Sequence, residues 1–182
     1  MKISAIIPTF NEEEHISEAI KSVSWADEII VVDSFSKDKT IEIAKKFGVK
    51  IIQREYKYSA SQKNWAIPQS EHNWIFLLDA DERVSNSLKE EILNWKKTKP
   101  KKQSYWIYRT NHFMGKKIKF SGWKGDKVIR LFHRDCRYED KKVHAEIENS
   151  SKAGKLKSPI LHFTFKSMSH YLLKWDQYSS WS

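Results

Sequence analysis

The segment that most constrains the fold of this chain is an apolar run that ends in three carboxylates. Residues 74–78 read WIFLL, and Asp79, Asp81 and Glu82 follow with only Ala80 among them. Five consecutive large apolar residues predict a strand buried on both faces, as in the centre of a parallel sheet. Open α/β sheets bind ligands at the carboxyl ends of such strands. Asp79 and Asp81 could therefore share one divalent cation, although so short a motif is also common in ordinary turns.

The first hundred residues alternate between short apolar strands and amphipathic helices. Strands are expected at residues 3–7, 28–33, 49–53 and 74–79, and helices at 16–23, from 34–38 through 47, at 59–68, and from Ser85 or Ser87 to 95. This alternation predicts βαβ crossovers and a parallel sheet with helices on both faces. Further strands at 105–109 and 127–133 lack a crossover helix between them, which indicates a mixed or antiparallel second half. We expect an α/β fold in a single domain of 182 residues, divided into residues 1–100, 101–165 and a C-terminal helix at 166–182.

Composition limits the compartment and the partners. The single cysteine, Cys136, excludes an intramolecular disulfide and suits a reducing compartment, so a cytoplasmic location is expected. Met1 leads directly into a strand-like segment, so we expect no signal peptide, and no apolar run approaches the roughly 20 residues of a spanning helix. The net charge of +10 favours a polyanionic partner, either nucleic acid, an anionic lipid surface or a phosphorylated substrate. The lysine-rich segment 96–102 is read first as a solvated loop.

Four short segments lie at the expected strand ends and helix starts in a fixed order. They are IIPTFNE at 6–12, IVVDS at 30–34, QKN at 62–64 and LDADE at 78–82. In order and spacing they resemble the nucleotide-binding half of family-2 inverting glycosyltransferases, which implies a Rossmann-like glycosyltransferase A-type fold whose second half faces the acceptor. A weaker resemblance, through GWKGDKVIRLF at 122–132 and the pair Val143 and His144, is to the bacterial branch that adds β-linked sugars to the lipopolysaccharide core.

The resemblance implies a nucleotide-diphosphate sugar as donor, with a UDP-hexose expected. Donor contacts would come from Pro8, Thr9, Asn11, Glu12, Asp33, Lys63, Asp79 and Arg130. Carboxylates and a side-chain amide suit the nucleoside, because they accept hydrogen bonds from ribose hydroxyls and from a uracil N–H. Asp81, with Asp79 and His144, would hold Mn²⁺ or Mg²⁺ as a Lewis acid for the leaving nucleotide. Arg130 could instead pair with a buried acid, and His144 could be structural.

An inverting transfer also needs a general base for the acceptor hydroxyl. Asp126 is the first candidate, because it follows a glycine-containing loop and precedes a strand. Glu146 is the second, since the related branch often has Glu directly after Val-His, whereas Ala145 intervenes here. Glu82 is assigned to loop or helix structure rather than to the site.

Together these features predict a metal-dependent transferase that glycosylates a glycan or glycolipid in lipopolysaccharide or cell-envelope polysaccharide synthesis. It would be cytoplasmic, at the inner face of the cytoplasmic membrane, with peripheral contact with anionic lipid. Trp106, Trp123 and Trp181 lie in polar surroundings where a sugar or headgroup could stack, and the helix at 166–182 would either pack on the core or face a membrane or acceptor.

The alternative is a nucleotide-sugar-binding pseudoenzyme, suggested by the Ala145 departure and by an end some tens of residues earlier than in that branch. Nucleic acid is not expected, because the strand-end acids would face its phosphates.

Overall fold

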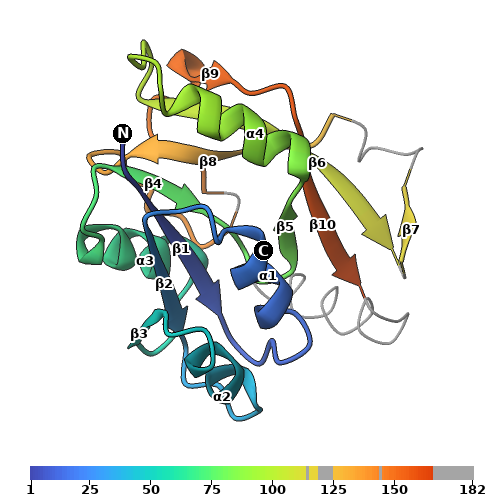
Figure 1. Ribbon diagram of the computed structural model, residues 1–182. Coiled ribbons are helices and arrows are strands. Elements are labelled where there is room, and N and C mark those ends of the chain that lie inside the picture. The colour runs from blue at the N-terminus through green and yellow to red at the C-terminus, as the bar shows by residue number, and fades with distance from the viewer. Residues whose placement is uncertain (114, 119–124, 144, 166–182) are drawn as a thin grey trace.

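The computed structural model describes residues 1–113, 115–118, 125–143 and 145–165 (Figure 1). His144, Trp123, Trp181 and the expected helix at 166–182 lie outside the described residues. The strands are β1 (Ile3–Thr9), β2 (Glu28–Asp33), β3 (Lys50–Gln53), β4 (Trp74–Leu77), β5 (Glu82–Val84), β6 (Ser104–Phe113), β7 (Lys116–Lys117), β8 (Lys127–His133), β9 (Gly154–Lys155) and β10 (Ile160–Phe165). The helices are α1 (Ile16–Ser22), α2 (Thr40–Lys45), α3 (Ser59–Ala66) and α4 (Asn86–Trp95), with 3-10 turns at Ile67–Gln69 and Ser150–Lys152.

The described strands join in one mixed sheet of order β3-β2-β1-β4-β8-β6-β10-β5, and β7 and β9 also pair with β6. The first four strands in this order are parallel, as the alternation of strands and helices predicts. β8 runs antiparallel to both β4 and β6, which confirms the mixed second half. The parallel half and the antiparallel half therefore meet where β4 lies beside β8.

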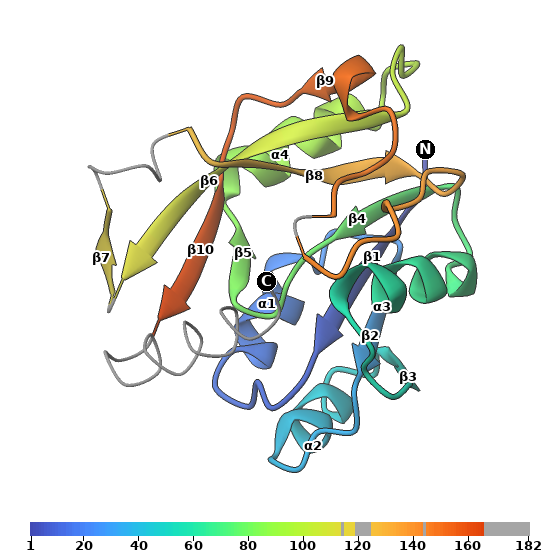
Figure 2. The same cartoon turned by 180° about the vertical axis from the view of Figure 1, so that it is seen from behind.

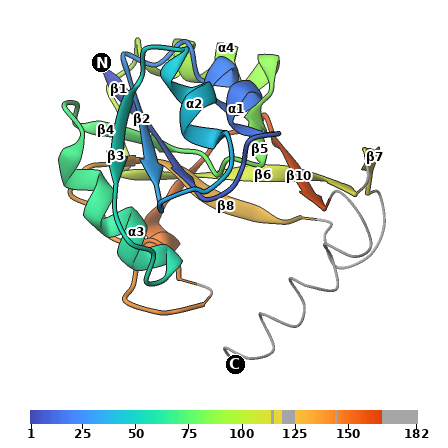
Figure 3. The same cartoon turned by 90° about the horizontal axis from the view of Figure 1, so that it is seen from below.

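Helices cover both faces of the sheet, as Figures 2 and 3 show. Side chains from α1, α2 and α4 share one buried cluster with Ile7 and Leu131. Side chains from α3 share the other cluster with Ile129 and Phe132, together with Tyr138 from the segment after β8. Apolar positions on each helix therefore point inward at helical spacing, and the sheet is buried on both faces.

A β-bulge in β8 aims one side chain away from the regular alternation of the strand. Tyr105 pairs with Leu131, but its neighbour Trp106 pairs with Ile129, so Arg130 is the extra residue. Ile129 and Leu131 would share a face in a regular strand, yet they lie in opposite core clusters. Bulges commonly redirect a side chain beside an active site, and this one turns the buried Arg130 toward the acids that follow β4.

The structure corrects the assignment of Glu82 to loop or helix. Glu82 begins β5, and its side chain is fully buried. β5 pairs antiparallel with β10, opposite His162, a partner about 80 residues away that no local pattern could indicate. A buried carboxylate is tolerated at this position because Arg130 and Arg109 supply positive charge to it.

The start of α4 resolves the choice between two serines. Ser85 is the N-cap, and its Oγ accepts a hydrogen bond from Leu88 N–H (3.2 Å). The expected strand at 74–79 ends two residues earlier, at Leu77, and α2 ends at Lys45 rather than at 47. Gly48 follows α2 with φ +65°, the left-handed conformation that ends a helix at little steric cost. In the described part of the chain, no helix is both long and apolar enough to cross a bilayer.

Candidate active site

Two loops at the carboxyl edge of the sheet are joined by side chain–backbone hydrogen bonds. Asn11 N–H donates to Ser36 Oγ (2.9 Å), and Lys37 N–H donates to Asn11 Oδ1 (2.8 Å). Glu12 N–H donates to Thr40 Oγ1 (2.8 Å). Asn11 has φ +53°, a left-handed conformation that this residue type tolerates better than most. Asn11 and Glu12 therefore hold the loop after β1 against the loop after β2 and the start of α2, at the edge where nucleoside contacts are predicted.

Thr9 and Asp33 are neighbours at the same edge, because they are register partners at the ends of β1 and β2. Pro8 and Thr9 both belong to β1, which extends two residues beyond the expected strand at 3–7. The carboxylate of Asp33 is fully buried and accepts hydrogen bonds from Ser36 N–H (3.0 Å) and Gln53 Nε2 (2.9 Å). Thr9 Oγ1 is buried and has no hydrogen-bond partner among the described residues, which leaves it able to bind a ligand hydroxyl.

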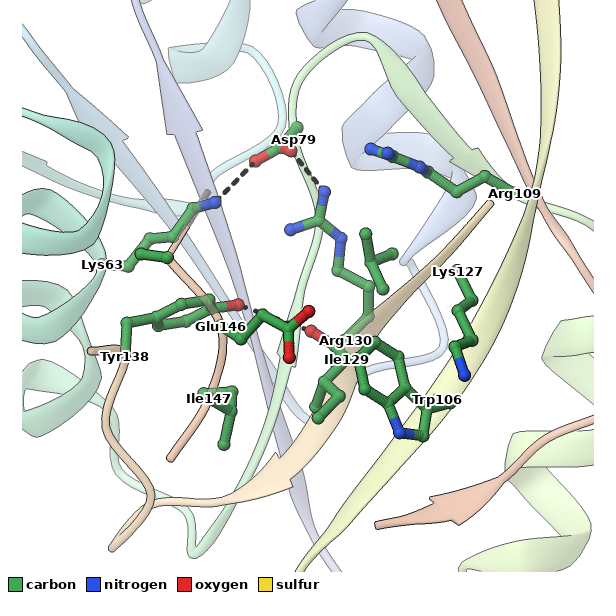
Figure 4. A pocket seen from close by; sticks show the side chains of 12 residues that line it. Lys63, Asp79, Trp106, Arg109, Lys127, Ile129, Arg130, Tyr138, Glu146 and Ile147 are labelled. Carbon is green, nitrogen blue, oxygen red and sulfur yellow. Dashed lines mark hydrogen bonds and ion pairs between the residues drawn. The ribbon is translucent and has the colours of Figure 1, made fainter. Parts of the chain in front are cut away.

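Asp79 lies between two buried cations. Its carboxylate accepts a hydrogen bond from Arg130 Nη2, and the Nζ atom of Lys63 lies 3.7 Å from Oδ1 (Figure 4). Burial disfavours the charged form of Asp79, but Arg130 and Lys63 outweigh burial and hold the pKa of Asp79 well below its ordinary value. Burial also lowers the pKa of Lys63, against the attraction of Asp79. Three predicted donor-site residues are thus brought together, with Asp79 ionised.

Glu82 is the deepest member of this cluster. It accepts hydrogen bonds from Arg130 Nη2 (2.7 Å) and from the backbone N–H of Asp79 (3.1 Å). Arg109 Nη1 lies 3.6 Å from the same carboxylate. The Nε atom of Arg130 is buried without a hydrogen-bond partner among the described residues, so this arginine can still donate to a ligand. Glu82 and Arg109 are not predicted as site residues, because nothing in the sequence near either one indicates its ion pairs.

Asp81 faces His162, which the sequence also does not indicate as a site residue. His162 Nε2 lies 3.5 Å from Asp81 Oδ2, and its Nδ1 lies 2.7 Å from Asn111 Oδ1. The side chain of Asp81 is 16% exposed, so it can reach a ligand at the edge of the sheet. The described residues contain no group of three or more His, Cys, Asp or Glu side chains arranged to hold a metal. A partly exposed carboxylate such as that of Asp81 is the kind of ligand with which Mn²⁺ or Mg²⁺ is bound together with substrate phosphates.

The first candidate base, Asp126, is strongly engaged. Arg109 donates to both of its oxygens (2.8 and 2.9 Å), and Asn111 Nδ2 donates to Oδ2 (3.0 Å). Burial disfavours the carboxylate, but the hydrogen bonds from Arg109 and Asn111 lower the pKa of Asp126 below its ordinary value. Asp126 is therefore a stable anion and a weak proton acceptor.

A cavity of about 270 Å³ opens beside Asp79 (Figure 4). It is lined by Lys63, Asp79, Trp106, Arg109, Lys127, Val128, Ile129, Arg130, Tyr138, Ala145, Glu146 and Ile147. Burial raises the pKa of Tyr138 above its ordinary value, which keeps the phenol neutral. The second candidate base, Glu146, is exposed on the cavity wall and accepts a hydrogen bond from Ser150 Oγ (2.9 Å). Four cationic side chains against two carboxylates make the lining suitable for an anionic ligand.

Trp106 forms a fixed aromatic wall of this cavity. Its indole N–H donates to the backbone carbonyl of Ser150 (3.2 Å), and Lys127 Nζ lies 4.7 Å from the ring centroid. The predicted sugar-stacking role of Trp106 is compatible with this position, because one edge of the ring is anchored while the residue as a whole stays partly exposed.

Comparison with known proteins gives a family match over most of the chain. The family model described as glycosyl transferase family 2 matches residues 4–139. The lipopolysaccharide core biosynthesis glycosyltransferase LpsC of Rhizobium meliloti is 27% identical over 198 aligned residues, covering 99% of this chain and 70% of LpsC. An uncharacterized glycosyltransferase of Rickettsia bellii is 46% identical over 92 residues, covering 50% of this chain and 31% of that protein. This chain thus matches less than a third of the length of the rickettsial relative.

Solved structures with the same fold are also found. Staphylococcus aureus TarS, residues 1–349, crystallised in complex with UDP-GlcNAc, gives a TM-score of 0.63 at 19% identity, covering 90% of this chain and 59% of TarS. Glucosyl-3-phosphoglycerate synthase from Mycobacterium tuberculosis, crystallised with Mn²⁺, UDP and glucosyl-3-phosphoglycerate, gives a TM-score of 0.50 at 23% identity, covering 63% and 44% of the two chains. These likenesses establish a glycosyltransferase A-type, Rossmann-like fold.

Proposed function

Because the chain belongs to glycosyl transferase family 2, we propose that it moves a hexosyl group with inversion from a UDP-sugar to a hydroxyl of a glycan or glycolipid. The proposed role is in lipopolysaccharide or cell-envelope polysaccharide synthesis, as the name of the relative LpsC suggests. The observation that carries the proposal is the position of acids at the ends of β2 and β4, because Asp79 after β4 also lines a cavity that contains four cationic side chains. The single cysteine supports a cytoplasmic location, and a glycolipid acceptor would bring the protein to the inner face of the membrane.

The donor would lie along the carboxyl edge of the sheet. Thr9 and Asp33 would contact the nucleoside, with Asn11 and Glu12 holding the loop that carries them. The diphosphate would reach Lys63 and the unpartnered Nε–H of Arg130. An anion there would contact two cations that are paired with Asp79 and Glu82 in this structure. Hydrogen bonds from such cations to phosphate are charge-assisted and strong. In the crystal structures of TarS and of the mycobacterial synthase, the bound nucleotides are also uridine diphosphates.

A divalent cation fits beside this diphosphate. Asp81 would be the main protein ligand, with His162 beside it, while Asp79 remains directed toward Arg130 and Lys63. His144 remains a predicted ligand outside the described residues. When bound, Mn²⁺ or Mg²⁺ supplies Lewis acidity that offsets the charge developing on the leaving nucleotide. The crystallised mycobacterial synthase contains Mn²⁺, which supports a metal of this class.

Between the two candidate bases, the contacts favour Glu146. Both oxygens of Asp126 already accept hydrogen bonds from Arg109, and Asp126 lies outside the described lining of the cavity. Glu146 lines the cavity and accepts a described hydrogen bond at one oxygen, from Ser150. We infer that Glu146 takes the proton of the acceptor hydroxyl, and that Asp126 fixes Arg109 in place.

The test measures UDP release from UDP-glucose and UDP-GlcNAc with Mn²⁺, in the presence and absence of glycan acceptors, together with UDP affinity by calorimetry. Asp81→Ala should abolish metal-dependent UDP release, and Glu146→Gln should lower kcat by about 10²–10⁴-fold while UDP still binds. Glu42→Gln, on the exposed side of α2, is the control. An unchanged rate in Asp81→Ala would refute the proposed mechanism. UDP binding without turnover on any acceptor or water would instead indicate a nucleotide-sugar-binding pseudoenzyme.

A further inference from the structure

Two lysine-rich segments that are about 50 residues apart in the chain lie side by side. β9 pairs with β6, so Gly154 lies opposite Tyr105 and Lys155 opposite Trp106 (Figure 1). A Cβ atom at position 154 would lie 2.7 Å from the Tyr105 ring and 3.4 Å from Lys102 Cγ. The contact is therefore so close that glycine is required there, and it brings the segment after α4 against the segment around β9.

Exposed lysines dominate these two segments, and the acids that contact them come from elsewhere in the chain: Glu91 accepts from Lys157 N–H (2.8 Å) and Glu146 from Ser150 Oγ (2.9 Å). We define the lysine patch as Lys99, Lys101, Lys102, Lys152 and Lys155, five of the seven exposed lysines in residues 96–102 and 150–157. Residues 96–102 and 150–157 contain no acidic side chain. Within the described part of the chain, none of the five lysines forms an ion pair, whereas the adjacent Lys96 pairs with Asp27 (2.7 Å). Five like charges gathered in this way repel one another and create a positive field for an anionic partner.

The patch adjoins the cavity at the wall formed by Trp106. Lys155 is the register partner of Trp106, and the indole of Trp106 is anchored to the Ser150 carbonyl, two residues before Lys152. The nucleotide edge lies elsewhere, at the ends of β1 and β2. A partner bound to the patch would therefore lie beside the Trp106 wall of the cavity, on the side proposed for the acceptor. It would leave the proposed donor edge accessible.

The chemistry of the patch fits a bilayer better than a nucleic acid. All its cations are lysines, which act as strongly hydrated point charges, whereas arginine is preferred for the bidentate recognition of phosphates. Neither segment contains an aromatic side chain, and the single neighbouring ring of Trp106 provides no row of rings on which successive bases could stack. We propose that the lysine patch docks the protein on an anionic phospholipid bilayer and so brings a membrane-held acceptor to the cavity. The role of the acceptor rests on the proposed function, but the docking itself does not.

The experiment compares two variants of equal net charge. The patch variant carries Lys101→Gln, Lys102→Gln, Lys152→Gln and Lys155→Gln. The control carries Lys45→Gln, Lys57→Gln, Lys116→Gln and Lys117→Gln, four exposed lysines outside the patch. Both have a formal charge of +6, that is, +10 less four. Binding is measured by co-sedimentation with vesicles of phosphatidylcholine and phosphatidylglycerol, and with phosphatidylcholine alone, at 0.1 M salt.

The unaltered protein should bind only the anionic vesicles, and the control should bind within about fivefold of it. The patch variant should lose affinity by roughly a hundredfold or more, since each lysine near such a surface contributes about 1 kcal/mol, or about fivefold. Equal losses in the two variants would overturn the proposal, as would tighter binding of the unaltered protein to a 30-nucleotide single strand than to the vesicles. UDP affinity should be unchanged in the patch variant. Vesicle binding without any UDP binding would refute the proposed function and leave the docking surface in place.

Discussion

Replacing Glu82 by glutamine tests whether the buried charge cluster is held together by this acid. The side chain of Glu82 is fully buried, and that of its partner Arg130 is 4% exposed. Removing one member of a buried pair costs roughly 3–5 kcal/mol, because the other charge remains in a dry environment. We expect about 3 kcal/mol, the low end of that range, because Arg130 keeps Asp79 as a partner and glutamine still accepts from the N–H of Asp79.

The measurement is urea unfolding at pH 7.5, followed by the fluorescence of the eight tryptophans. In a separate thermal unfolding experiment, a loss of about 3 kcal/mol should lower the melting temperature by roughly 6–12 °C for a chain of this size. Glu28→Gln is the matched control, since Glu28 is also largely buried but its cation, Lys50, is 43% exposed and stays hydrated when the pair is broken. If Glu82→Gln costs no more than Glu28→Gln, the reasoning from a desolvated cluster is wrong. The double variant with Arg130→Gln should lose less than the sum of the single losses.

Two further predictions concern acid stability and the start of α4. Because the pKa of Asp79 lies well below its unfolded value of about 3.9, its contribution to stability is complete above that value and is lost as the pH falls through the folded pKa. Asp79→Asn should therefore flatten the fall of the urea midpoint between pH 4 and pH 2, and parallel curves would contradict this. Ser85→Ala should cost about 1 kcal/mol in urea unfolding, because Ser85 Oγ caps Leu88 N–H and also donates to the Pro159 carbonyl (2.7 Å). The neighbouring exposed Ser87, whose Oγ contacts Ser85 (3.1 Å), is the comparison, and an equal loss in Ser87→Ala would refute the cap.

The sequence predicts the elements whose periodicity is local. The expected strand at residues 127–133 matches β8 at both ends, and α4 follows directly from the spacing of Leu88, Ile92 and Trp95. β5, β9 and β10 were not predicted. The first two are only two or three residues long, and the pairing of all three is with strands distant in the chain. Contacts of this kind depend on tertiary packing, which local patterns do not encode.

The residues of the candidate site also divide into those that the local sequence indicates and those that it does not. Asp33, Asp79 and Asp81 are indicated by their place after apolar strands, and the structure puts them at the carboxyl ends of β2 and β4. Glu82 and His162 are not indicated, because their roles arise only when β5 pairs with β10. Glu82 has the local sequence of a solvated loop residue. Only the fold shows its ion pairs with Arg109 and Arg130, which are distant in sequence.

The bulge residue Arg130 is not required for the strand pairing of β8, but it supplies a cation to the candidate site. Removing the codon for Arg130 would place Ile129 directly before Leu131, and their pairing with Trp106 and Tyr105 would become an uninterrupted ladder. Ile129 and Leu131 would keep the opposite faces that they already occupy. The ladder of β8 could thus be built with one residue fewer, and the cost of such a deletion would come from Asp79 and Glu82, which would lose their shared cation. If Asp79 and Glu82 were also replaced by neutral residues, position 130 is where β8 could shorten while keeping its ladder.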